Sequence, residues 1–172
     1  CIFIFDEAHH LPQKALSHFS LGGSTEFMKT SIRQYHNVMD QVTKITKTKA
    51  PESLIEKTDI AIADLIEVIS NFDYQDDIHL FGLSGVSSEI NNLTKHILVL
   101  FNMAYKEFSE QKDNWEEFYK SNNIEQSTAD NVSNVIGQNN QNLSSILSLL
   151  NTFNQSQNQD QTPTSNWISQ SK

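Results

Sequence analysis

An adjacent Asp-Glu pair, Asp6 and Glu7, follows a short apolar run, Ile2 to Phe5, at the beginning of the chain. Such a run is typical of a buried parallel strand, and open α/β sheets bind ligands at the carboxyl ends of their strands. One carboxylate placed there can hold Mg²⁺ on the phosphates of a nucleotide, while the other accepts a proton from the attacking water. The alternative is an ordinary strand-to-helix turn with acidic residues at the start of a helix.

The residues around this pair favour the first interpretation. Residues 6–9, Asp-Glu-Ala-His, resemble the DEAH box of superfamily 2 helicases, and with His-Leu-Pro at 10–12 they resemble the bacterial DinG-type helicases, relatives of XPD. The resemblance in matched letters covers the first sixteen residues or so. It implies that Asp6 holds Mg²⁺ and that Glu7 activates the hydrolytic water beside bound ATP. It also implies that His9 couples the nucleotide state to the neighbouring helicase motifs.

A phosphate-binding loop is missing from the sequence. No G-x-x-x-x-G-K-[ST] pattern occurs, and the segment 22–24, Gly-Gly-Ser, is followed by Thr25 and Glu26 rather than by a lysine. A metal-binding strand without that loop cannot hold the triphosphate. Because the chain also begins without Met inside an apparent strand, we expect an internal piece of a longer protein that has no ATPase activity by itself.

A large insertion follows the DEAH residues. In DEAH-box RNA helicases a Ser-Ala-Thr motif returns a few dozen residues later, whereas this chain reaches Lys172 without one. DinG and XPD helicases carry a helical arch domain at this point. The resemblance therefore implies that residues 1–19 end a RecA-like motor domain, that 20–155 form the arch, and that 156–172 are a polar linker returning to the motor. It implies a bacterial, cytoplasmic, 5′-to-3′ DNA helicase that acts on single-stranded and forked DNA in repair or replication.

Hydrophobic spacing predicts a mainly α fold of long antiparallel helices, preceded by one strand. Only 5 Gly and 3 Pro are available to interrupt helices. Apolar residues recur at steps of three and four in four stretches. The expected helices cover about 25–47, from Pro51 to Phe72, from Ile90 through Phe108 and on to Tyr119, and from a capping candidate near Ser127, with Asp130 three residues later, to Phe153. A short helix is expected near Pro12, a break over 73–85, and no fold over 154–161.

The single cysteine limits the cofactors that the chain can hold. A 4Fe-4S cluster needs four thiolates, so although DinG and XPD relatives often carry one, its ligands would lie upstream of this segment. One cysteine also excludes an internal disulfide, which agrees with a reducing cytoplasm. No apolar run approaches the length of a membrane span, so no membrane is expected as a partner.

The net charge of −9 opposes a simple DNA-binding surface. A local exception is the basic group Lys44, Lys47 and Lys49, with Arg33 earlier on the same expected helix. These residues either touch a DNA backbone or form a solvated helix end that the helix dipole favours. A different class of function also stays open, in which residues 20–155 are a non-enzymatic helical module that recruits a protein partner through its acidic surface.

Overall fold

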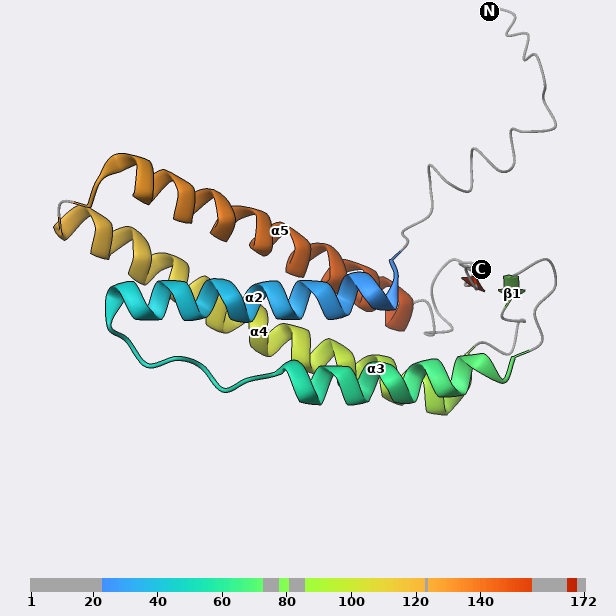
Figure 1. Ribbon diagram of the computed structural model, residues 1–172. Coiled ribbons are helices and arrows are strands. Elements are labelled where there is room, and N and C mark those ends of the chain that lie inside the picture. Colours follow the sequence, from blue (N-terminus) through green and yellow to red (C-terminus); the bar gives the residue numbers. More distant parts are fainter. Residues whose placement is uncertain (1–22, 73–77, 81–85, 123, 156–166, 170–172) are drawn as a thin grey trace, which may run out of the picture.

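Four long helices make up most of the part that the structure describes. The computed structural model describes residues 23–72, 78–80, 86–122, 124–155 and 167–169. The helices are α2 (Thr25–Thr46), α3 (Ile55–Ser70), α4 (Ser88–Ser121) and α5 (Gln126–Gln155), and successive helices run in opposite directions (Figure 1). This confirms a mainly helical fold. The strand over residues 2–5 and the short helix near Pro12 that we expected lie outside the described residues.

The helices pack as a bundle with a central pair. Helices α2 and α4 contact each other, and both contact α3 and α5. Helices α3 and α5 lie on opposite sides of the α2–α4 pair (Figure 1). Because each helix presents one apolar face, this arrangement buries all four faces in a single continuous core.

Local signals set the ends of α2. The Ser24 hydroxyl accepts a hydrogen bond from the Phe27 N–H at 3.1 Å, which caps the N-terminus. The helix ends where Lys47 adopts φ 56°, in the left-handed region, and its N–H bonds the Thr43 carbonyl. The end predicted at residue 47 is therefore displaced by one residue.

The predicted start of α3 is wrong, and the predicted start of α5 is displaced by one residue. Helix α3 begins at Ile55 rather than at Pro51, and Leu54, which precedes it, is buried. Helix α5 begins before Ser127, whose hydroxyl lies 2.9 Å from the Glu125 carboxylate instead of capping the helix. The Glu125 carbonyl accepts from the N–H of Ala129 and so opens the helical hydrogen bonding.

A short pair of strands lies beside the helices. Strand β1 (Ile78–Leu80), between α3 and α4, pairs antiparallel with β2 (Trp167–Ser169), which follows α5. The sequence predicted a break around β1 and a polar linker around β2, and a strand in neither. It also gave no fold to Asn154 and Gln155, which belong to α5.

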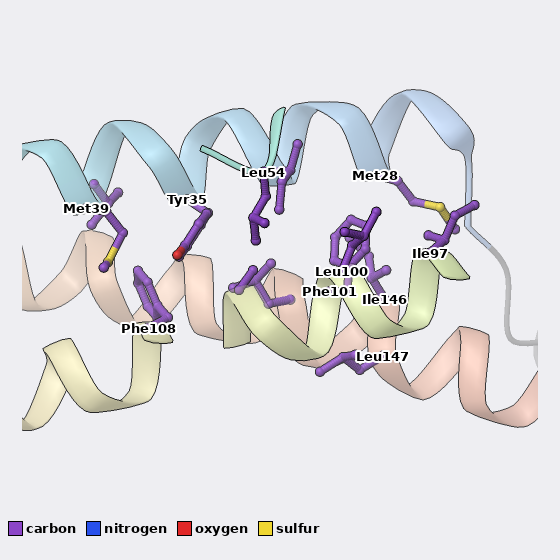
Figure 2. Close-up of a cluster of buried hydrophobic side chains, with 14 of the residues drawn as sticks. Met28, Tyr35, Met39, Leu54, Ile97, Leu100, Phe101, Phe108, Ile146 and Leu147 are labelled. Carbon is purple, nitrogen blue, oxygen red and sulfur yellow. The ribbon is translucent and has the colours of Figure 1, made fainter. Parts of the chain in front are cut away.

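The core is formed by large apolar side chains from every helix, and Figure 2 shows part of it between α2, α4 and α5. Those that are almost fully buried are Ile32, Tyr35 and Met39 of α2, Ile62 of α3, Ile90, Ile97, Phe101, Phe108 and Trp115 of α4, and Leu143 and Ile146 of α5. Burying such a side chain contributes roughly 1.5–3 kcal/mol. The predicted stripes were wrong at Ile45 and Val135, which are exposed.

Candidate functional site

The residues with the strongest chemical signal, Asp6, Glu7 and His9, lie outside the described residues. What the structure does describe is the bundle that follows, including the four basic residues proposed as DNA contacts and a half-buried polar cluster.

The structure separates the four basic candidates into two groups. Lys44 lies in the last turn of α2, Lys47 is its C-cap, and Lys49 follows two residues later, all with exposed side chains. Arg33 lies eleven residues before Lys44, a rise of about 16 Å along a helix. The three lysines thus gather at one end of α2, and Arg33 is placed apart from them.

Arg33 already has an acidic partner. Its Nη2 lies 2.8 Å from Oδ2 of Asp59 on α3, and both side chains are partly exposed. An ion pair of this exposure contributes about 0.2–1 kcal/mol, and it links α2 to α3. A phosphate at Arg33 would have to compete with this carboxylate, whereas no ion pair among the described residues involves Lys44, Lys47 or Lys49.

A half-buried polar cluster, which was not predicted from the sequence, joins three helices. The Tyr35 hydroxyl on α2 donates to Oε2 of Glu107 on α4 at 2.5 Å. Burial raises the pKa of Tyr35 far above its ordinary value, and the hydrogen bond to Glu107 and the charge of Glu107 raise it further. Tyr35 is therefore a neutral donor that satisfies a carboxylate at the edge of the core.

His36 completes the cluster from the next position on α2. Its Nε2 accepts a hydrogen bond from the Leu54 N–H at 2.8 Å, and its ring meets the Tyr35 ring edge-on at 4.7 Å between centroids. Burial lowers the pKa of His36, against the opposing charges of Asp40 and Glu107. A neutral imidazole whose acceptor nitrogen is occupied holds the start of α3 in place, so the cluster works as a structural joint.

Part of this cluster could have been suspected from the sequence. Tyr35 lies on the predicted apolar stripe, and a buried tyrosine hydroxyl usually finds a hydrogen-bond partner. The identity of that partner depends on how α2 and α4 pack, because Glu107 is 72 residues away in the sequence. Nothing in the local pattern distinguishes Glu107 from the other acidic residues of α4.

Amide side chains line a hollow of about 290 Å³ between α2 and α5. Asn139 is buried there, and its Nδ2 donates to the Val135 carbonyl at 2.9 Å while its Oδ1 has no protein partner. The other polar residues of the hollow are Gln34, Asn37, Gln41, Gln138 and Asn142. None of them ionises, so the hollow offers no acid, base or charged metal ligand. Within the described ranges, no three His, Cys, Asp or Glu side chains lie close enough together to hold a metal ion.

Comparison of the chain with protein-family models, curated proteins and solved structures returned no match. Among the described helices, none is long and apolar enough to cross a membrane. A function is therefore inferred from the motif at residues 6–12 and from the helices that follow it.

Proposed function

We propose that this chain is a segment of a DinG-like, ATP-dependent DNA helicase. Residues 1–19 end its first RecA-like motor domain, 20–155 form a helical arch inserted after the DEAH box, and 156–172 lead back to the motor. The observation that carries the proposal is the sequence Asp-Glu-Ala-His-His-Leu-Pro at 6–12, followed by a bundle of long helices. The chain enters and leaves this bundle at the same end (Figure 1).

The position of the bundle's ends supports an insertion. Helix α2 begins at the same end of the bundle at which α5 finishes (Figure 1). Gly23 packs so closely on α5 that a Cβ added to it would lie 2.4 Å from Cδ2 of Leu149. The Thr94 hydroxyl near the start of α4 bonds Asn154 at 2.8 Å, near the end of α5. A domain inserted into another must leave its host and return to it, so adjacent ends are the arrangement that an insertion needs.

The donor set of the motif fits the chemistry proposed for it. Mg²⁺ prefers carboxylate oxygens and is usually bound by one or two carboxylates together with substrate phosphates. In the helicase, Asp6 holds the Mg²⁺ that accompanies ATP, Glu7 accepts the proton of the attacking water, and His9 transmits the nucleotide state. The phosphate loop, and the ligands of any 4Fe-4S cluster, belong to parts of the protein upstream of this chain.

The arch in this proposal acts as a lid or wedge beside single-stranded or forked DNA. The acidic net charge of −9 leaves most of the DNA track to the motor domains. Lys44, Lys47 and Lys49 form a basic group at one end of α2 that is available to a phosphate backbone, whereas Arg33 is paired with Asp59. The 5′-to-3′ direction, the role in repair or replication and the bacterial cytoplasm follow from the resemblance.

The decisive experiment is a Glu7→Gln substitution in the longer protein that contains this segment. The amide cannot accept a proton from water, so we expect steady-state ATP hydrolysis with single-stranded DNA to fall by at least about a hundredfold, while binding of Mg²⁺-ATP is retained through Asp6. Glu26→Gln, an exposed acidic residue in the first turn of α2, is the matched control and should leave hydrolysis unchanged. Hydrolysis by Glu7→Gln within a few-fold of the unmodified protein would contradict the proposal.

A further inference from the structure

Two exposed ridges, one on α3 and one on α4, have nearly the same spacing and opposite charge. Each ridge has an ionisable residue at both ends and apolar residues between them. The α3 ridge consists of Glu56, Ile60, Ala63 and Glu67, and the α4 ridge consists of Lys95, Val99, Met103 and Lys106. In both ridges the terminal charges are eleven residues apart, which corresponds to about 16 Å along a helix.

Both ridges face away from the core. On α3, the buried residues Thr58, Ile62 and Leu65 occupy the face opposite Ile60. On α4, the buried residues Ile97 and Phe101 occupy the face opposite Val99. All eight ridge residues are exposed, so each ridge is a continuous line of side chains that nothing in the described bundle covers.

The apolar residues of the ridges are the most exposed large hydrophobic side chains of the described bundle. Ile60 and Val99 are each 55% exposed, and Met103 is 43% exposed. Ile60 and Ala63 border an open, mainly apolar hollow of about 630 Å³ that carries acidic residues, including Glu56, at its edge. The α3 ridge therefore lies beside an open apolar surface with acidic residues at its edge, which suits an apolar ridge with basic ends.

The α4 ridge is basic, although the chain as a whole is acidic. The protein has a net charge of −9, yet α4 has no acidic residue between Glu89 and Glu107. Lys95 and Lys106 stand in that interval, and the two ion pairs found among the described residues use neither of them, nor Glu56 or Glu67. These four exposed residues therefore have no ion-pair partner within the described bundle. The two lysines are separated by the same number of residues as the two glutamates.

We propose that the α3 ridge of one copy of this chain docks on the α4 ridge of a second copy. Ile60 and Ala63 then pack against Val99 and Met103, and the terminal lysines meet the terminal glutamates. Different patches meet across this contact, so head-to-tail repetition of it can build chains or rings. A single helix-to-helix contact is small beside a standard interface, so the association is weak, roughly micromolar or weaker.

Charge reversal on each ridge separately provides a test with an internal rescue. One variant of the 172-residue chain carries Lys95→Glu and Lys106→Glu, and the other carries Glu56→Lys and Glu67→Lys. Each variant alone has two ridges of like charge, so its self-association, measured by sedimentation velocity over a concentration series, should weaken by about tenfold or more. An equimolar mixture of the two variants again pairs opposite ridges, and its association should return.

Controls distinguish docking from misfolding and from general charge effects. A Lys44→Glu, Lys49→Glu variant alters the net charge by the same amount as the Lys95, Lys106 variant, but at the exposed end of α2, and should associate as the unmodified chain does. Circular dichroism should show unchanged helix in all variants, since every substituted side chain is exposed. Three results would overturn the proposal: an unmodified chain that stays monomeric up to millimolar concentration, single variants that associate undiminished, or a mixture that fails to recover.

Discussion

The two halves of the bundle differ in how many helices enclose the core. Helix α3 begins beside His36 and covers only the half that contains the start of α2, the start of α4 and the end of α5. We call this the four-helix half. In the other, three-helix half, the segment 47–54 runs along the bundle in place of a helix (Figure 1).

The cores of the two halves are filled by different kinds of side chain. The four-helix half is mainly aliphatic around Phe101 (Figure 2). The three-helix half depends on aromatic residues of α4, with Trp115 buried and its Nε1 donating to the Ser133 hydroxyl at 3.2 Å. The rings of Phe118 and Tyr119 pack beside Trp115 at 6.3 and 6.1 Å between centroids. Large rings thus enclose a core that fewer helices surround, and the Tyr35–Glu107–His36 joint marks the boundary.

The comparison between the two halves predicts its largest effect when one aromatic ring is removed from each half. Phe101→Ala removes a side chain enclosed on all sides, so we expect it to destabilise the protein by about 3–5 kcal/mol. Phe118→Ala on the same helix removes a half-buried ring beside solvent, and should cost no more than about half as much. Urea unfolding followed by circular dichroism measures both. Equal losses would show that the three-helix half is enclosed as tightly as the other.

A smaller effect is expected at the joint between the halves. Tyr35→Phe keeps the ring in the core but removes the donor to Glu107, leaving a part-buried carboxylate without that hydrogen bond. We expect a loss of about 1–2 kcal/mol, and close to no further loss when Glu107→Gln is added to it. A double-mutant cycle by urea unfolding measures the coupling. Additive losses from the two substitutions would mean that the bond does not tie α2 to α4.

The smallest effect is a pH dependence that comes from His36. Burial holds the pKa of His36 below its ordinary value, so in acid the unfolded chain takes up a proton before the folded chain does. Stability should therefore be full above about pH 6.5 and should fall as the pH drops below it, until the folded state is protonated as well. His36→Gln keeps an acceptor for the Leu54 N–H but does not titrate. Its urea midpoint should change less between pH 7 and 5, and an identical change in both proteins would refute this role.

The helices were predictable from the sequence because each carries its own apolar period. Met28, Ile32 and Tyr35 repeat at helical spacing whatever they pack against, and all three are buried. The start of α3 was not predictable in this way, since Pro51 suits a helix start and only the tertiary position of Leu54 moves that start to Ile55.

Features that depend on contacts between residues far apart in the sequence could not be predicted from the local pattern. Strands β1 and β2 are three residues each and are about ninety residues apart, so neither shows a usable alternation of its own. The two charged ridges were also missed, because the apolar period of a helix identifies the buried face and gives no reason to compare the exposed faces of two helices. The candidate catalytic residues Glu7 and His9 and the candidate metal ligand Asp6 come from the motif alone.

The central claim, a helical insertion that is separable from the motor strand before it, is tested most directly by deleting residues 1–12. The contacts among α2, α3, α4 and α5 all lie within residues 25–155, so none of them is lost. We predict that the shortened chain keeps its far-ultraviolet helical signal and its urea midpoint. A cooperative loss of helix on deletion would contradict the account, because the bundle would then depend on the segment that carries the DEAH box.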